Sequence, residues 1–163
     1  MKLSSTNFLR FAVVCLGVPV LALCVYFLPQ LAMEAIEQLK NGSELAYVVL
    51  GLLSIMYASA IPFYYALYQA MKLLRYIDKN EAFSQISVDA LKKIRTCAIT
   101  ISGMYAVALP LIFVIAQWDD APGLVLIGLV VVGAAMVIAV FAALLKKLLQ
   151  EAINIKSEND LTV

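Results

Sequence analysis

The residues of this chain that could do chemistry are few and widely spaced. The thiols are Cys15, Cys24 and Cys97, and the chain contains no histidine. A redox pair needs two neighbouring cysteines, and a structural zinc site needs clustered cysteine and histidine ligands. Cys15 and Cys24 are nine residues apart, which puts them on different faces and at different depths of a helix. The sequence therefore predicts no metal site and no cofactor.

Acid–base chemistry lacks its usual residues as well. Proton-coupled membrane exporters depend on an acidic side chain inside the membrane, and the long apolar segments of this chain contain none. Serine and tyrosine hydroxyls remain as nucleophiles, but no base lies at helical spacing from them in those segments. We therefore expect no catalytic residue and no enzymatic activity.

The elements that carry these residues are four stretches without Lys, Arg, Asp or Glu. About 20 apolar residues in a helix cross the roughly 30 Å hydrocarbon core of a bilayer, so each stretch is long enough to span it. The four predicted spans are residues 11–33, 45–71, 96–118 and 121–145.

Composition supports a membrane protein independently. The chain has 163 residues, of which 64% are hydrophobic and 14% charged, and a soluble domain could not hide that much apolar surface. The connections between spans are too short to fold a separate domain. We predict an all-α fold, a single four-helix transmembrane domain over residues 1–163 with an up-down-up-down bundle.

Orientation follows from the positive charges. Eleven of the 12 Lys and Arg residues flank the spans on one side, and only Lys40 lies on the other, together with Glu34, Glu37, Glu44, Asp119 and Asp120. The positive-inside rule then predicts a cytoplasmic N-terminus, a cytoplasmic loop at residues 72–95 and a cytoplasmic tail at 146–163. The first apolar run exceeds the 7–15 residues or so of a signal peptide, so we expect an uncleaved span in the cytoplasmic (inner) membrane of a bacterium.

Inside the spans the residue pattern indicates packing. Pro19, Pro62 and Pro110 each remove a helical amide hydrogen, which predicts bends or hinges. Small residues recur every fourth position in the last two spans, which favours close helix contact within the chain, with a homo-oligomer face as the alternative. These stripes are Ala98, Ser102 and Ala106, and Ala135, Ala139 and Ala143.

Two tyrosines, Tyr57 and Tyr105, should lie near mid-depth, where each hydroxyl needs a partner. We expect them to bond to one another or to Ser54 and Ser102. A path lined by Tyr57, Tyr105 and Gln117, with the prolines as hinges, is the basis of an alternative interpretation as a small transporter or channel component.

The predicted cytoplasmic segments are also helical. The second span should continue to about Asp78, with Ser84 or Ser87 capping a new helix that has Asp89 in its first turn and leads into the third span. The fourth helix should run past Leu145 and end around Ser157 to Asp160. The tail either packs against the segment at 86–94 or presents its end to a partner.

Two short motifs resemble those of a bacterial family of four-helix integral membrane proteins, the domain of unknown function family 2975. The loop after the second span has the form Ile-Asp-x-x-x-x-Phe-Ser, and the tail ends in Glu-Asn-Asp-Leu-Thr-Val. The resemblance covers most of the chain and makes these motif positions the candidate partner-binding residues: Asp78, Phe83, Ser84, Glu158, Asn159, Asp160, Leu161, Thr162 and Val163.

The resemblance also implies a partner. Genes of this family often stand beside one for a small helix-turn-helix regulator, so we expect a non-enzymatic regulatory or sensory protein, embedded in the lipid bilayer, that holds such a cytoplasmic protein. No direct contact with nucleic acid is expected. The same polar motif residues would alternatively cap and join helices.

Overall fold

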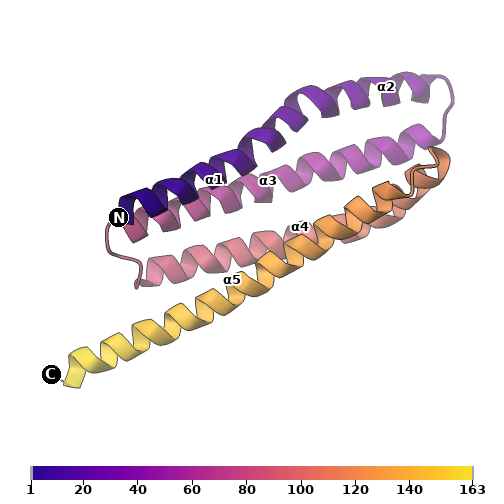
Figure 1. The fold of residues 1–163 in the computed structure, drawn as a ribbon. Coiled ribbons are helices and arrows are strands. Elements are labelled where there is room, and N and C mark those ends of the chain that lie inside the picture. The colour runs from indigo at the N-terminus through magenta and orange to yellow at the C-terminus, as the bar shows by residue number, and fades with distance from the viewer. Residues whose placement is uncertain (1, 163) are drawn as a thin grey trace.

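The computed structural model describes the backbone of residues 2–162 and the side chains of residues 6–161. Figure 1 shows long helical rods that run alternately up and down, joined by short turns, with the beginning of α1 and the end of α5 at the same end of the molecule. The elements in chain order are α1 (Lys2–Ala22), η1 (Leu23–Phe27), α2 (Leu28–Lys40), α3 (Leu45–Asp78), α4 (Gln85–Trp118) and α5 (Gly123–Thr162).

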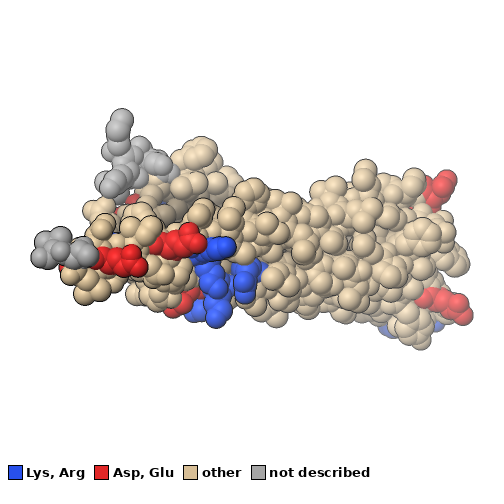
Figure 2. Space-filling view, turned by 90° about the horizontal axis from the view of Figure 1, so that it is seen from below, with Lys and Arg blue, Asp and Glu red and all other residues tan. Residues whose placement is uncertain are grey.

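All four rods are long and apolar enough to cross a bilayer, over residues Thr6–Lys40, Leu45–Asp78, Gln85–Trp118 and Gly123–Leu161. The prediction of an all-α protein with four spans is therefore confirmed. The helices extend well past the charge-free stretches, so that 79–84 is the only part of the segment 72–95 outside a helix. Figure 2 shows the charged side chains toward the two ends, with an uncharged belt between them.

The turns use residues that tolerate left-handed backbone. Gly42, Asn80 and Asp120 have φ values of 87°, 60° and 51° and stand at the three connections between rods. Glycine, asparagine and aspartate adopt this conformation at the lowest cost. We call the end with the turns at 41–44 and 119–122 the acidic end, and the end with the 79–84 loop the cationic end.

The first rod is continuous through α1, η1 and α2, but η1 is a π-helix. Its wider turn lets the Leu28 amide donate to the Leu23 carbonyl. The next amide in that register would belong to residue 29, which is a proline and has no N–H. The Cys24 carbonyl therefore loses its helical donor, and the Tyr57 hydroxyl on α3 donates to it instead, at 2.9 Å.

This result adds a feature that the sequence did not predict and corrects one expectation. The α-helical pattern of the first rod is interrupted beside Pro29, whereas Pro19 lies within α1 and the bend expected there stays a prediction. The mid-depth tyrosines do find partners, but not the expected ones: Tyr105 bonds to Ser59 at 3.1 Å. Ser54 and Ser102 bond to the carbonyls of Leu50 and Val132.

The middle of the structure is α4, which packs against α3 on one side and α5 on the other. Ala98 and Ser102 on α4 are buried, as are Ala135 and Ala139 on α5. Ala106 is exposed and Ala143 is only half-buried, and Ala108 and Ala142 are buried instead. A strict four-residue spacing drifts by about 40° per turn of a 3.6-residue helix, so a buried line must alternate steps of three and four.

The α4–α5 contact leaves little room at Gly128. A Cβ atom placed there would lie 2.9 Å from Leu109 Cδ2 and 3.1 Å from Ile112 Cδ1, whereas one at Gly133 would meet nothing within 4 Å. The substitution Gly128→Leu should therefore lower the free energy of unfolding by about 1–3 kcal/mol through overpacking. Gly133→Leu on the same helix is the matched control and should not. Thermal unfolding in detergent micelles measures both, and equal midpoints would show that the two helices do not meet at Gly128.

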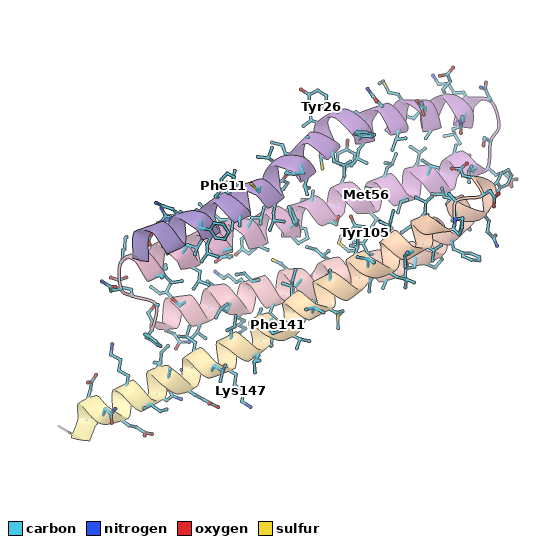
Figure 3. The ribbon with its side chains drawn as sticks, in the orientation of Figure 1. Phe11, Tyr26, Met56, Tyr105, Phe141 and Lys147 are labelled. Atoms are coloured by element: carbon cyan, nitrogen blue, oxygen red, sulfur yellow. The ribbon has the colours of Figure 1, made fainter. Side chains whose placement is uncertain are left out.

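The π-helix makes a second prediction. Tyr57→Phe leaves the Cys24 carbonyl without a donor at hydrocarbon depth, which should cost about 1–2 kcal/mol of unfolding free energy. Tyr26→Phe is the matched control, since Tyr26 lies in η1 itself, is 70% exposed and points outward in Figure 3. Unfolding in micelles followed by circular dichroism compares them. A Tyr57→Phe protein as stable as Tyr26→Phe would contradict the bond.

Candidate functional site

Asp78 is the last residue of α3, and its carboxylate contacts the first rod. Its Oδ2 accepts a hydrogen bond from Arg10 Nη2 at 2.5 Å, and the Asp78 side chain is only 13% exposed. Arg10 belongs to α1, so this ion pair ties the beginning of the first span to the end of the second. That placement favours the helix-joining role for Asp78 over direct contact with a partner.

The structure also buries polar side-chain atoms that the sequence did not predict. Four buried side-chain atoms have no hydrogen-bond partner within the described part of the chain: Arg10 Nε, Gln69 Oε1, Asp78 Oδ1 and Arg95 Nε. Gln69 is 2% exposed. The sequence pointed to this burial only through the position of Gln69 in a charge-free stretch. Burying an amide inside an apolar run is costly unless the amide has a hydrogen-bond partner.

Ser84 and Phe83 take different roles in the connecting loop. Ser84 stands at the N-cap of α4 with extended backbone, and its carbonyl accepts from the amides of Ser87 and Val88. Its hydroxyl lies 3.4 Å from that of Ser87 rather than on a backbone amide. Asp89 consequently falls beyond the first turn, contrary to expectation. Phe83 is 60% exposed and remains available as a contact surface.

The tail motif lies on the last turns of α5. The helix runs through Glu158, Asn159, Asp160 and Leu161 to Thr162, two residues beyond the expected end. Leu161 is 83% exposed. The side chain of Thr162 and the whole of Val163 lie outside the described residues, so the expectation that the tail presents its end to a partner stays a prediction.

The two motifs do not form one site. Figure 1 shows the end of α5 extending past the 79–84 loop and away from it. The Ser102 hydroxyl on α4 donates to the Val132 carbonyl on α5, so these two residues lie at the same level. Because the two helices are antiparallel, Gln85, which is 17 residues before Ser102, lies level with about residue 149, which is 17 residues after Val132. The tail motif then lies roughly 15 Å farther along the axis. The tail accordingly does not pack against the segment at 86–94.

Residues considered for other chemistry are also apart. The described residues contain no group of three or more His, Cys, Asp or Glu side chains that could hold a metal ion. Tyr57 and Tyr105 are hydrogen-bonded within the bundle, whereas Gln117 lines a separate cavity of about 330 Å³ at the acidic end, with Asp120 and Pro122. The three residues of the expected path thus do not share one cavity.

Comparison with known proteins gives a family and a full-length relative. A family described as a protein of unknown function (DUF2975) matches residues 31–163. An uncharacterized membrane protein YoaS from Bacillus subtilis (strain 168) is 55% identical over 163 residues, which is the whole length of both chains. No solved structure matches the chain. These relationships confirm the predicted family and a bacterial multi-pass membrane protein.

The ion pair at the cationic end gives a prediction about the stability of the protein. Asp78→Asn leaves Arg10 without its carboxylate in a half-buried place and should lower the unfolding free energy by about 1–3 kcal/mol. The exchanged pair Arg10→Asp with Asp78→Arg should recover part of the loss. Asp89→Asn, at an exposed acid on α4, is the control. An Asp78→Asn protein that unfolds with the same midpoint as the unsubstituted protein would show that the pair is not structural.

Proposed function

The chain belongs to the DUF2975 family of proteins of unknown function, and we propose that it is a non-enzymatic membrane protein that binds a small cytoplasmic protein along the projecting end of α5. In this proposal both termini and the cationic end face the cytoplasm, as the positive-inside rule requires. The partner is a small helix-turn-helix regulator, which the membrane protein holds at the bilayer.

The observation that carries the proposal is the length of α5. Its charge-free part ends at Leu145, yet the helix continues without a break to Thr162. The 17 residues from Lys146 onward would extend about 25 Å beyond the apolar segment. A helix needs neighbours or a partner to be stable at this length in water, because an isolated helix of this size is marginal. Most of this extension projects past Gln85, the first residue of α4.

The exposed face of this extension has the pattern of a docking helix. Leu148, Ala152 and Ile155 follow at i, i+4 and i+7, the spacing with which an amphipathic helix fills a groove on a partner. Leu148 is 53% and Ile155 59% exposed. We call the side chains of Leu148, Ala152 and Ile155 the docking stripe. A partner would cover it with apolar surface of its own.

Charge on the extension is balanced, which favours an apolar contact over an electrostatic one. The extension contains three cationic residues and three acidic ones, namely Lys146, Lys147 and Lys156, and Glu151, Glu158 and Asp160. Apolar burial then has to supply most of the affinity, at about 25 cal/mol per Å². Phe83, exposed in the loop, is a second apolar contact that a partner of sufficient size could reach.

The alternative as a transporter or channel component has less support in the structure. It required a path lined by Tyr57, Tyr105 and Gln117, and these side chains face different neighbours.

A crosslinking pull-down from native membranes tests the proposal, with the tag at the N-terminus so that the tail stays free. The double variant Leu148→Asp with Ile155→Asp puts two carboxylates in the docking stripe and should reduce recovery of the partner by tenfold or more, since tenfold is about 1.4 kcal/mol. Ser157→Asp, exposed on the same extension, is the control and should recover it normally.

The recovered protein is identified by mass spectrometry. A small helix-turn-helix protein that is crosslinked to the unsubstituted and Ser157→Asp proteins, and lost from the double variant, is the expected result. Equal recovery from all three, or recovery of the membrane protein alone, would refute the docking role of the stripe.

A further inference from the structure

Two adjoining cavities lie between the helices near mid-depth. One has a volume of about 290 Å³ and the other about 360 Å³, and both are lined by Leu23, Met56, Tyr105 and Val131. These residues come from η1, α3, α4 and α5, so all four rods contribute. Figure 3 shows Met56 and Tyr105 at the same level of the molecule. We call the two cavities together the midplane groove.

The groove opens toward the bilayer rather than toward water. The first rod packs along α3 and α5 packs along α4, without extended contact between the first rod and α5 in the described residues. Leu23 and Val131 therefore stand on opposite rims of the same groove. Both residues are near the centres of charge-free stretches, some 15 Å from either end of the hydrocarbon core.

The polar groups in the groove have already used their hydrogen-bond donors. The Ser59 hydroxyl donates to the Met56 carbonyl at 2.8 Å, so the Tyr105 hydroxyl must be the donor in its 3.1 Å bond to Ser59. The Cys24 carbonyl accepts from Tyr57. The groove offers a ligand apolar contact and almost no hydrogen bonding, which excludes a polar or charged solute.

The length of the groove fits one lipid tail. It extends along α3 from Leu52 to Phe63 and along α4 from Ile115 to Ile101. At 1.5 Å per residue these distances are about 16 and 21 Å, comparable to the roughly 15 Å depth of one leaflet.

We propose that the midplane groove binds one acyl chain of a bilayer phospholipid, inserted laterally between η1 and α5. The groove cannot be hydrated at this depth, and if it were empty its lining would lose dispersion contacts on one side. An acyl chain is the apolar molecule that the bilayer supplies there. The π-helix forms part of the rim, and its widened turn displaces the first rod locally, beside Leu23.

Photo-crosslinking tests the site directly. The full chain is placed in nanodiscs of phosphatidylethanolamine and phosphatidylglycerol in equal parts, doped with a phosphatidylcholine that carries a diazirine midway along one acyl chain. After irradiation, mass spectrometry of peptides measures lipid adducts on Met56 and Tyr105. Ile61 is 74% exposed and Val107 is 70% exposed on the same two helices. Adducts on these two residues measure labelling by the lipid that surrounds the protein.

Adducts on Met56 and Tyr105 should exceed those on Ile61 and Val107. Val131→Phe fills the groove and should reduce the groove adducts by about tenfold, the effect of losing 1.4 kcal/mol of binding. Val130→Phe is the matched control because Val130 is the adjacent residue and is 61% exposed, and it should leave them unchanged.

Two results would overturn the proposal. They are groove adducts no higher than those on the outward residues, and groove adducts unaffected by Val131→Phe. If Val131→Phe fails to fold, the ratio of groove to outward adducts in the unsubstituted protein still decides.

Discussion

The structure depends on one constraint, that a backbone polar group in the hydrocarbon core of a membrane must have its hydrogen-bond partner within the protein. This requirement makes every charge-free stretch a helix and gives the one irregular turn its form. Where Pro29 removes an amide, the helix widens into the π-turn Leu23–Phe27 and the Tyr57 hydroxyl supplies the missing donor to Cys24. A local defect in the first rod thus becomes a bond between the first and second spans.

The four rods are consequently joined in two different ways. Small side chains bring α4 and α5 together, and Gly128 lies against Leu109 and Ile112 with no room for a side chain of its own. The first rod is instead attached to α3 by side chains that cross to it, namely Tyr57 and Tyr64 to backbone carbonyls and Arg10 to Asp78. Because the first rod and α5 each follow a different neighbour, a groove remains between them at mid-depth.

The two ends of the molecule are built for different environments. At the cationic end, the carboxylate of Asp78 is occupied by Arg10, which makes it part of the scaffold. Beyond that level α5 alone continues, with Ile155 and Leu161 exposed. The end of α5 thus projects from the bundle, and the proposed partner would bind to its surface.

The sequence by itself determined the number and length of the spans, the helical continuation at both sides of the 79–84 loop and the family, because charge-free length, capping residues and short motifs are local properties. It also indicated that hydroxyls at mid-depth would be bonded. Only the tertiary structure decided which partners they take, that Asp78 pairs with Arg10 and that the tail stays apart from the loop. These depend on the register and tilt of helices far apart in the chain. The groove has the same origin, since it is the space left where the first rod and α5 do not meet, and no single segment encodes it.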